Sequence, residues 1–480
     1  MSFSLEIESF IKDYVKELDQ GTASIFAGAG LSIPAGFVNW SELMRDIAND
    51  IGLDIETETD LISLAQFHVN ENQNRTKISK KILEEFIDDT EETDKHRIIA
   101  TLPVSSVWTT NYDTLIEQSF LHADKVPDIK FTEKQLLDNR PKRDVIVYKM
   151  HGDVTVPSEA ILTKEQYEQY HRTHEGFINA LTGELTTKTF LFLGFSFTDP
   201  NLDYVLSRLN FRFSGDKKQH YCIVKKHILR DGLNPDEATL EYNTRKQALV
   251  INDLKRYGIK SLLVESYEEI TDILKEIQNR FKMRSVFVSG SAEKYDPYSR
   301  FEAVEFIHRV SKKLIESNYR IVNGFGWGVG SAVINGALEA IHSKPLKYSE
   351  SQLVLRPFPQ FKTGDKELPV LWEEYRDKMI SLCGIAIFLF GNKNSDGDIV
   401  DANGVISEFE MAASNGVFCI PVACTGYAAK AISEKVMQSL SDYYPNPDVA
   451  KVFLESLSNE ETELSEKEDV LIDFINELTK

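Results

Sequence analysis

Apolar and polar positions follow two patterns along this chain, one typical of helices and one typical of buried strands. Residues 5–19 carry apolar side chains three and four positions apart, which predicts an amphipathic helix. Short, mostly apolar runs predict strands buried on both faces, as in a parallel sheet covered by helices. In the first half of the chain these runs lie at residues 23–26, 105–109, 145–150, 190–193, 221–224 and 261–264.

The same alternation restarts after a predicted helix over residues 267–282. The second series of strands is predicted at 285–288, 319–322, 352–355, 384–390 and 418–422, with helices between them. A chain of 480 residues is also too long for one hydrophobic core. We therefore expect an α/β protein of two Rossmann-like parallel-sheet domains, at residues 1–283 and 284–480.

Glycines and polar residues follow four predicted strands of the first domain. Open α/β sheets bind ligands at the carboxyl ends of their strands, so we expect these segments to meet at one site. The segments are Gly28-Ala29-Gly30-Leu31-Ser32, Thr109-Thr110-Asn111-Tyr112-Asp113, His151-Gly152-Asp153 and Gly194-Phe195-Ser196-Phe197-Thr198-Asp199.

Each segment suits a dinucleotide but also has a structural explanation. The glycines let the backbone approach a pyrophosphate, and they equally permit a tight turn. Asn111 and Asp113 could hold ribose hydroxyls or begin a helix, and Ser196 and Asp199 could hold the adenosine ribose or cap the following helix. Histidine is suited to proton transfer near neutral pH, and the glycine after His151 would leave space for a ligand, which favours a catalytic base.

Together these segments resemble the sirtuin superfamily over the first expected domain. In that family the glycine loop lies on NAD, the asparagine and aspartate line the nicotinamide-ribose end, and the histidine is the catalytic base. The resemblance implies that Asn111 and His151 are the catalytic residues. It also implies an NAD⁺-binding set of Ala27, Gly28, Ala29, Gly30, Ser32, Asp113, Gly194, Ser196 and Asp199.

The cysteines depart from the protein-deacylating sirtuins, which carry a zinc module built on Cys-x-x-Cys pairs. This chain has four cysteines and no such pair, so we expect no metal. Without that module the simplest acceptor for the ribose is water. NAD⁺ is then the expected substrate, in a site that holds the ribose and admits one nucleophile.

The second domain also carries glycines and charged residues near predicted strand ends. Ser289-Gly290-Ser291 and the alternating glycines from Gly324 to Gly330 could cradle phosphates. Residues 402–410 resemble the Gly-Gly-x-Gly-Thr-x-x-Glu segment of the SLOG, or LOG-like, family, with the glycine cluster reduced to Gly404. The reduced cluster favours binding of a nucleotide without turnover.

A sirtuin-like domain followed by a SLOG domain resembles the effectors of the Thoeris antiphage defence system. The resemblance implies a homo-oligomeric NAD⁺ hydrolase, a tetramer or larger assembly, that depletes cellular NAD⁺. Its activator would be a cyclic ADP-ribose isomer made by a TIR-domain partner protein. The implied signal-binding residues are Ser289, Gly290, Ser291, Gly326, Arg356, Arg376, Lys393 and Glu408.

Two alternatives to the hydrolase stay open: a non-catalytic nucleotide sensor, and a phosphoribohydrolase that acts through the SLOG domain. A sensor would not need both Asn111 and His151, and the reduced cluster at Gly404 argues against the phosphoribohydrolase. The net charge of −21 argues against nucleic acid as a partner. The sequence has no apolar run of about 18 residues and no signal-peptide pattern, so we expect a cytoplasmic protein without a membrane partner.

Overall fold

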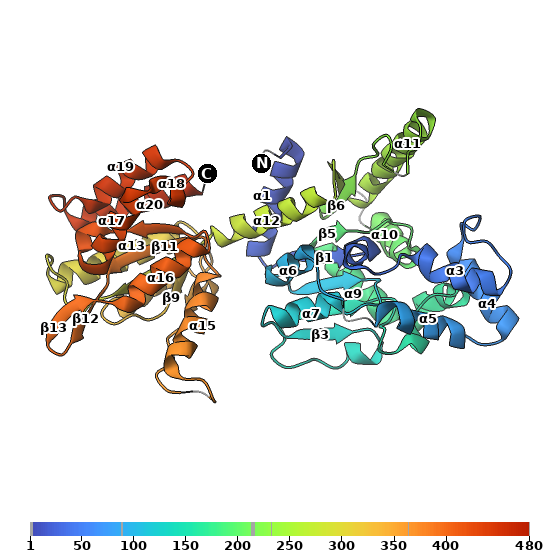
Figure 1. Ribbon diagram of the computed structural model, residues 1–480, viewed down its shortest axis with the longest axis horizontal. Coiled ribbons are helices and arrows are strands. Elements are labelled where there is room, and N and C mark those ends of the chain that lie inside the picture. The colour runs from blue at the N-terminus through green and yellow to red at the C-terminus, as the bar shows by residue number, and fades with distance from the viewer. Residues whose placement is uncertain (1–2, 88–89, 213–216, 232, 363, 480) are drawn as a thin grey trace. The chain divides into compact units, whose positions relative to one another are not determined.

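The computed structural model describes residues 3–87, 90–212, 217–231, 233–362 and 364–479 (Figure 1). The chain divides into two compact units, Met1–Gln278 and Asn279–Lys480. Each unit is an α/β structure with a parallel sheet of its own, as the alternating apolar runs predict. The division falls inside helix α12 (Glu268–Lys282), a few residues before the expected boundary.

The first unit is built on a seven-stranded sheet in the order β3-β4-β2-β1-β5-β6-β7, with parallel pairing throughout the described strands. The strands are β1 (Ala23–Ala27), β2 (Ser106–Thr109), β3 (Pro127–Lys130), β4 (Val145–Lys149), β5 (Thr189–Leu193), β6 (His220–Lys225) and β7 (Ile259–Val264). Strand β1 lies between β2 and β5, so the chain changes its direction across the sheet at this point. Such a switch opens a crevice at the carboxyl ends of the strands.

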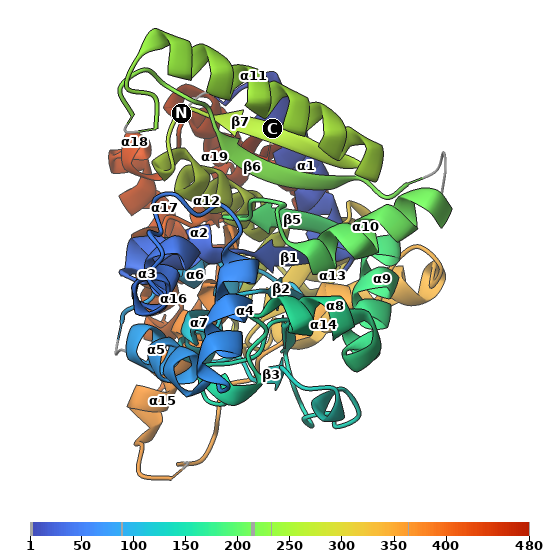
Figure 2. The ribbon, with the colours of Figure 1, turned by 90° about the vertical axis from the view of Figure 1, so that its right-hand side faces the viewer.

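Helices cover this sheet (Figure 2). They are α1 (Leu5–Asp19), α2 (Ala29–Ser32), α3 (Trp40–Asp50), α4 (Leu61–Asn72), α5 (Thr76–Phe86), α6 (Asp94–Thr101), α7 (Leu115–His122), α8 (Lys164–Thr173), α9 (Glu175–Thr187), α10 (Pro200–Arg212), α11 (Glu237–Leu254) and α12. Single 3-10 turns lie at Ile33–Ala35, Lys134–Leu136, Pro157–Glu159 and Lys255–Tyr257.

Local sequence sets where these helices begin. The hydroxyl of Ser4 accepts a hydrogen bond from the Ile7 N–H (3.3 Å), so α1 starts where the apolar spacing predicts. Helix α3 begins at Trp40. Its cap is Asn39, which exchanges hydrogen bonds of 3.0 and 2.9 Å with Glu42 in a capping box.

Helices α3, α4 and α5 lie beside one another at one end of the first unit, in blue in Figure 2. Apolar side chains hold the three together, among them Leu43, Ile47, Leu64 and Ile82, all buried. The same cluster includes Tyr112, which follows β2. This helical group therefore packs against the loops at the carboxyl ends of the strands.

The second unit repeats the plan with a five-stranded parallel sheet in the order β10-β9-β8-β11-β14. Its strands are β8 (Ser285–Ser291), β9 (Arg320–Asn323), β10 (Leu353–Leu355), β11 (Ile385–Phe390) and β14 (Phe418–Pro421). A separate antiparallel hairpin joins β12 (Asn392–Ser395) to β13 (Asp398–Asp401). Here the order switches between β8 and β11, the position at which open α/β sheets commonly have a crevice.

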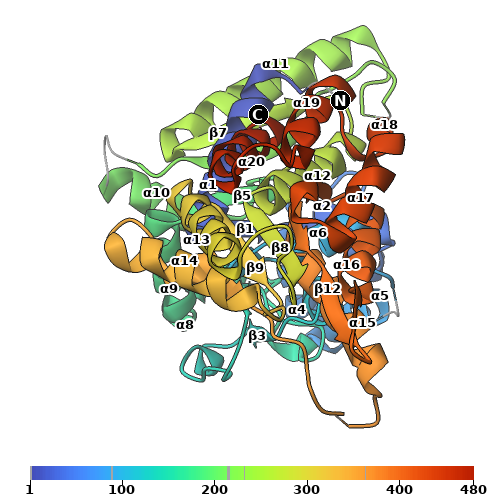
Figure 3. The same cartoon turned by 90° about the vertical axis from the view of Figure 1, so that its left-hand side faces the viewer.

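The helices of the second unit lie on both sides of its sheet. Figure 3 shows α13 and α14 on one side of β8 and β9, with α16 and α17 on the other. The helices are α13 (Arg300–Glu316), α14 (Gly330–Ser343), α15 (Leu368–Ile380), α16 (Asn403–Ser414), α17 (Tyr427–Gln438), α18 (Leu440–Tyr443), α19 (Pro447–Ser458) and α20 (Leu464–Leu478), with 3-10 turns at Glu350–Gln352 and Ala423–Thr425.

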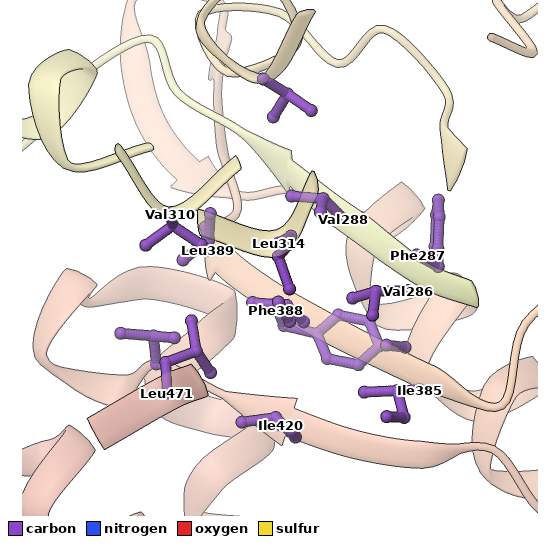
Figure 4. Close-up of a cluster of buried hydrophobic side chains, with 14 of the residues drawn as sticks. Val286, Phe287, Val288, Val310, Leu314, Ile385, Phe388, Leu389, Ile420 and Leu471 are labelled. Carbon is purple, nitrogen blue, oxygen red and sulfur yellow. The ribbon is translucent and has the colours of Figure 1, made fainter. Parts of the chain in front are cut away.

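The core of the second unit follows from its uniformly apolar strands. All six residues of β11 are buried, as expected for a strand covered on both faces. Figure 4 shows Ile385 and Phe388 of this strand packed among side chains of β8, α13 and α20. Burial of this kind contributes roughly 1.5–3 kcal/mol for each large aliphatic or aromatic side chain.

Candidate active site

A cavity of about 330 Å³ opens at the carboxyl ends of β1, β2, β4 and β5, where the strand order of the first unit switches. All four polar segments of the sequence contribute to its walls. The predicted residues that line it are Ala29, Gly30, Ser32, Asn111, Asp113, His151, Gly194, Ser196 and Asp199. Ala27 and Gly28 are not among its lining residues, and Ala27 ends β1 within the buried sheet.

The glycines of this site are required by contact between two loops. A Cβ atom on Gly28 would lie 2.4 Å from the carbonyl oxygen of Gly194, and one on Gly30 would lie 2.8 Å from the Cα of Gly194. Gly194 itself has φ of +62°, and a Cβ there would lie 2.5 Å from the backbone nitrogen of Leu31. The loop after β1 and the loop after β5 therefore interlock through backbone alone, independently of any ligand.

Asn111 fixes the loop after β2 to the loop after β1. Its Nδ2 donates to the carbonyl of Gly28 (3.2 Å) and to the hydroxyl of Ser32 (3.0 Å), and its N–H donates to Thr109 Oγ1 (2.9 Å). The side chain is buried. Because helix α7 begins at Leu115, Asn111 does not cap it, which leaves its amide oxygen Oδ1 as a group that can face a ligand.

Asp113 and Asp199 each accept a hydrogen bond from a backbone N–H at the start of the helix that follows them. Asp113 Oδ1 accepts from the N–H of Leu115 (3.1 Å), and Asp199 Oδ1 accepts from the N–H of Leu202 (2.9 Å) at the start of α10. Both residues also line the cavity. Ser196 instead forms a hydrogen bond of 2.8 Å with Thr198, within the loop.

His151 is paired with a buried carboxylate. Its Nε2 lies 3.1 Å from Asp199 Oδ2 and 3.4 Å from Asn201 Nδ2. Burial by itself raises the pKa of Asp199, but the charge and hydrogen bond of His151 and the amides of Leu202 and Asn201 lower it more, so the pKa lies below its ordinary value. The site thus holds an anionic carboxylate against the imidazole, which orients the ring.

The backbone conformation and packing of the loop after β4 require the glycine that follows His151. Gly152 has φ of +95°, and a Cβ there would lie 3.0 Å from the Cα of Ala160. The expectation that this glycine leaves space for a ligand is therefore wrong, because the chain at Ala160 already fills that space. The N–H of Ile161 donates to the carbonyl of His151 (2.8 Å) and fixes the same loop.

Sequence reasoning missed the aromatic wall of the cavity. Trp40, Phe86 and Tyr167 come from α3, α5 and α8, whose apolar spacing gives no sign that one of them faces a ligand. The ring of Tyr167 meets that of His151 edge to face, with centroids 5.4 Å apart. Burial, with a further contribution from Asp199, raises the pKa of Tyr167, so this phenol stays neutral. The Tyr167 ring therefore covers one side of the His151 imidazole.

A second cavity, of about 190 Å³, lies at the switch of strand order in the second unit. Six of the predicted signal-binding residues line it: Ser289, Gly290, Ser291, Gly326, Arg376 and Glu408. Arg356 and Lys393 do not; both are exposed, at the end of β10 and in the β12–β13 hairpin. The structure adds Phe358, which sequence reasoning missed and whose ring lies 5.3 Å from the Arg376 guanidinium.

The charged side chains of this second cavity, Arg376 and Glu408, do not form a hydrogen bond with each other. Ser289 Oγ donates to Glu408 Oε2 (2.5 Å), while Arg376 Nε lies 3.9 Å from Glu408 Oε1, beyond hydrogen-bond distance. Burial raises the pKa of Glu408 to about 7, against the lowering effects of Ser289 and Arg376. Arg376 Nε is buried without a hydrogen-bond partner among the described residues. A phosphate oxygen would satisfy that donor.

Two searches of the described part of the chain were negative. None of its helices is long and apolar enough to cross a bilayer. No group of three or more His, Cys, Asp and Glu residues there has a geometry that could hold a metal ion.

The chain is similar to known proteins along almost its whole length. Residues 105–247 match the SIR2-like domain, and residues 269–478 match the Sir2- and TIR-associating SLOG family. The NAD(+) hydrolase ThsA of Bacillus cereus (strain MSX-D12) is 47% identical over 98% of both chains. The NAD(+) hydrolase ThsA of Enterococcus faecium is 39% identical, again over 98% of both chains.

A more distant similarity covers part of the chain. Defense-associated sirtuin 2 of Bacillus subtilis is 23% identical over 65% of this chain and 31% of its own. At 39–47% identity over 98% of this chain, the similarity to the relatives named ThsA extends over both units. This chain therefore belongs to the ThsA family of NAD(+) hydrolases.

Proposed function

We propose that the first unit hydrolyses NAD⁺ to nicotinamide and ADP-ribose. The observation that carries this proposal is that Asn111 and His151 line the same cavity, in a chain of the ThsA family. The nicotinamide–ribose bond breaks with its electron pair leaving on the nicotinamide nitrogen, and a water oxygen bonds to the ribose carbon. His151 takes the proton of that water, and Asn111 holds a ribose hydroxyl or the water itself.

The pocket suits a reaction that passes through an oxocarbenium-like state. The ribose carbon becomes electron-deficient as nicotinamide leaves, and the carboxylate of Asp199 beside His151 supports the developing positive charge on the imidazole. The aromatic side chains limit the number of waters that reach the same carbon. The proposed reaction uses no metal.

We further propose that a cyclic ADP-ribose isomer bound in the second cavity activates the first unit. The glycines at Ser289–Ser291 and Gly326, with Arg376, offer backbone and guanidinium donors to its phosphates. The name of the matched SLOG family, which associates it with TIR domains, supports a TIR-domain protein as the source of the signal. Arg356 and Lys393 would reach the ligand from the rim.

The proposed role is NAD⁺ depletion in antiphage defence, in the cytoplasm, by a homo-oligomer such as a tetramer. The similarity to a defense-associated sirtuin supports the role in defence. Uncontrolled loss of NAD⁺ would harm the cell that makes the enzyme, so a resting state that awaits a signal fits this role. A ligand achieves such control only by binding the active state more tightly than the resting one.

NAD⁺ turnover by the purified protein tests the proposal. We expect turnover that rises when a cyclic ADP-ribose isomer is added, with nicotinamide released in equal amount to the NAD⁺ consumed. Asn111→Ala and His151→Ala should each lower kcat by about 10²–10⁴-fold, since each removes a group that acts on the reacting atoms.

Calorimetry with the same isomers provides the control for both variants, because their second cavity is unchanged and should bind the signal as before. Absence of NAD⁺ loss with every isomer would overturn the proposal in favour of a nucleotide sensor. Release of a nucleobase from a nucleoside monophosphate that depends on Glu408 would favour a phosphoribohydrolase.

A further inference from the structure

A buried lysine connects the two loops that carry Asn111 and His151. Lys149 is the last residue of β4, and its partner in the neighbouring strand is Thr109, the last residue of β2. Its side chain is fully buried, with no exposed surface. It does not line the cavity and the proposed chemistry does not use it. Burying an ammonium is costly unless hydrogen bonds and ion pairs compensate for its lost hydration.

The ammonium of Lys149 contacts both loops at once. On the Asn111 side, Nζ donates to the carbonyls of Tyr112 (3.1 Å) and Asp113 (2.7 Å). On the His151 side, it forms a short ion pair with the carboxylate of Asp153. The two loops are also joined by the N–H of Val154, which donates to the carbonyl of Tyr112 (3.0 Å), and by the Tyr112 hydroxyl, which donates to the carbonyl of Ile161 (2.8 Å).

A second carboxylate completes this cluster. Glu117 Oε1, from α7, lies 2.9 Å from Lys149 Nζ. Burial disfavours the charge of Lys149, but the carboxylates of Glu117, Asp153 and Asp113 outweigh it and raise the pKa of the lysine. Burial raises the pKa of Glu117 despite the nearby ammonium. Lys149 is thus charged, and its ammonium contacts groups from both loops and from α7.

We propose that Lys149 is a positioning residue that sets the separation of Asn111 and His151 by tying their two loops to one ammonium. This inference rests on the proposed NAD⁺ hydrolysis for its effect on rate. Lys149 contacts the carbonyl of Asp113, two residues after Asn111. It also contacts the carboxylate of Asp153, two residues after His151. A small change in the spacing of these loops would misplace the ribose hydroxyl or the water relative to the base, and a displacement of about 1 Å can cost about 10²-fold in rate.

The double variant Lys149→Met/Glu117→Gln tests the bridge, and it leaves the buried carboxylate of Asp153 without its ammonium partner. It removes one positive and one negative charge together, so the net charge of the cluster is that of the wild type. We expect kcat to fall by about 10- to 100-fold, with KM for NAD⁺ changed by less than about threefold, because misplacement acts on the transition state. The concentration of cyclic ADP-ribose isomer that gives half-maximal activation should stay unchanged.

Two control variants separate positioning from loss of stability. Glu117→Gln alone keeps every contact of Lys149 to the two loops, and we expect kcat near that of the wild type. Lys130→Met/Asp128→Asn removes another buried ion pair of the same sheet (2.9 Å), which touches neither loop. We expect this variant to lose stability comparably and to keep its kcat.

Hydrogen exchange measured without NAD⁺ gives a readout that does not depend on activity. We expect the amides of residues 150–156 to exchange faster in Lys149→Met/Glu117→Gln than in either control, because the loop that they form loses its tie. Wild-type exchange or wild-type kcat in this variant would overturn the inference while leaving NAD⁺ hydrolysis in place. If the wild type itself does not hydrolyse NAD⁺, the proposed function fails, and exchange alone decides whether Lys149 couples the loops.

Discussion

At the scale of single residues, two buried carboxylates have opposite properties because their neighbours differ. Asp199 lies against His151 and two helix amides, and these partners outweigh burial and keep its pKa low. Among the described residues, Glu408 has only a serine hydroxyl within hydrogen-bond distance and an arginine farther off, so burial prevails and raises its pKa to about 7. The first is suited to hold a charged partner, and the second can change its protonation near neutral pH.

Glu408→Gln should stabilise the second unit more at pH 8.5 than at pH 5.5. A carboxyl whose pKa is raised on folding contributes stability that is complete below its unfolded pKa of about 4.5 and is lost as the pH rises through about 7. The neutral amide removes this loss. We expect the difference in unfolding free energy between variant and wild type to grow by roughly 1–3 kcal/mol between these pH values, measured by denaturant unfolding.

Glu410→Gln is the matched control, since Glu410 is exposed on the same helix beside Lys435. Its effect on stability should be small and the same at both pH values. A Glu408→Gln effect that does not depend on pH would contradict the environment described for this carboxyl.

At the scale of elements, the close contact between the loops after β1 and β5 requires a residue without a Cβ atom at position 194. Alanine there would adopt a left-handed conformation and place its Cβ 2.5 Å from the Leu31 nitrogen and 2.6 Å from the Gly30 carbonyl carbon. We expect Gly194→Ala to lower the free energy of unfolding of the first unit by roughly 2–4 kcal/mol. Thermal unfolding checks this.

Gly183→Ala, in helix α9, provides the comparison. A Cβ on Gly183 would meet no atom within 4 Å, so alanine should stabilise the helix by about 0.5–1 kcal/mol. Equal effects of the two substitutions would show that the loops move apart freely, against the packing described here.

Uniformly apolar segments were among the elements that sequence reasoning predicted. The fully apolar β5 and β11 could be found because strands buried on both faces have no polar positions. The strand β3 was not predicted, because its four residues begin with a proline and include two charged side chains. The β12–β13 hairpin was missed because its residues are mostly polar and exposed.

Sequence reasoning could predict the site residues that follow strands, because the sheet brings strand ends together, but not those that come from helices. Polar residues directly after parallel strands, such as Asn111 and His151, come to one edge in any such fold. Trp40 and Tyr167 reach the cavity from helices, where the choice between core and cavity depends on tertiary packing. Tertiary packing likewise places Arg376, in α15, at the second cavity and leaves Lys393, in the β12–β13 hairpin, outside its lining.

At the scale of the whole molecule, two separate sheets each carry a cavity at the point where the strand order switches. Control of one cavity by the other needs a resting and an active state with different affinity for the signal. To change the active population from about 1% to about 99%, the signal must bind the active state about 10⁴-fold more tightly. Under the proposed activation, the response of NAD⁺ turnover to the signal measures the coupling between the units.

Arg376→Ala should raise the concentration of cyclic ADP-ribose isomer needed for half-maximal NAD⁺ turnover by about 10- to 100-fold, the effect of losing a charge-assisted hydrogen bond to phosphate. The rate at saturating signal should stay that of the wild type, because the first cavity is unchanged. Arg309→Ala removes an exposed charge of α13 and should leave the response unchanged. Activation of Arg376→Ala at the wild-type concentration would remove this residue from the signal site.

The contact between Gly28, Gly30 and Gly194 has a consequence for how such sequences evolve. Because these glycines fit one backbone against another, selection for a folded domain is enough to retain them after catalysis has been lost. A descendant that no longer cleaves NAD⁺ would still display the glycine loop while drifting at His151. Inactive members of the family would thus be recognised by a change at His151, two residues after β4, and not by the glycines of the pocket.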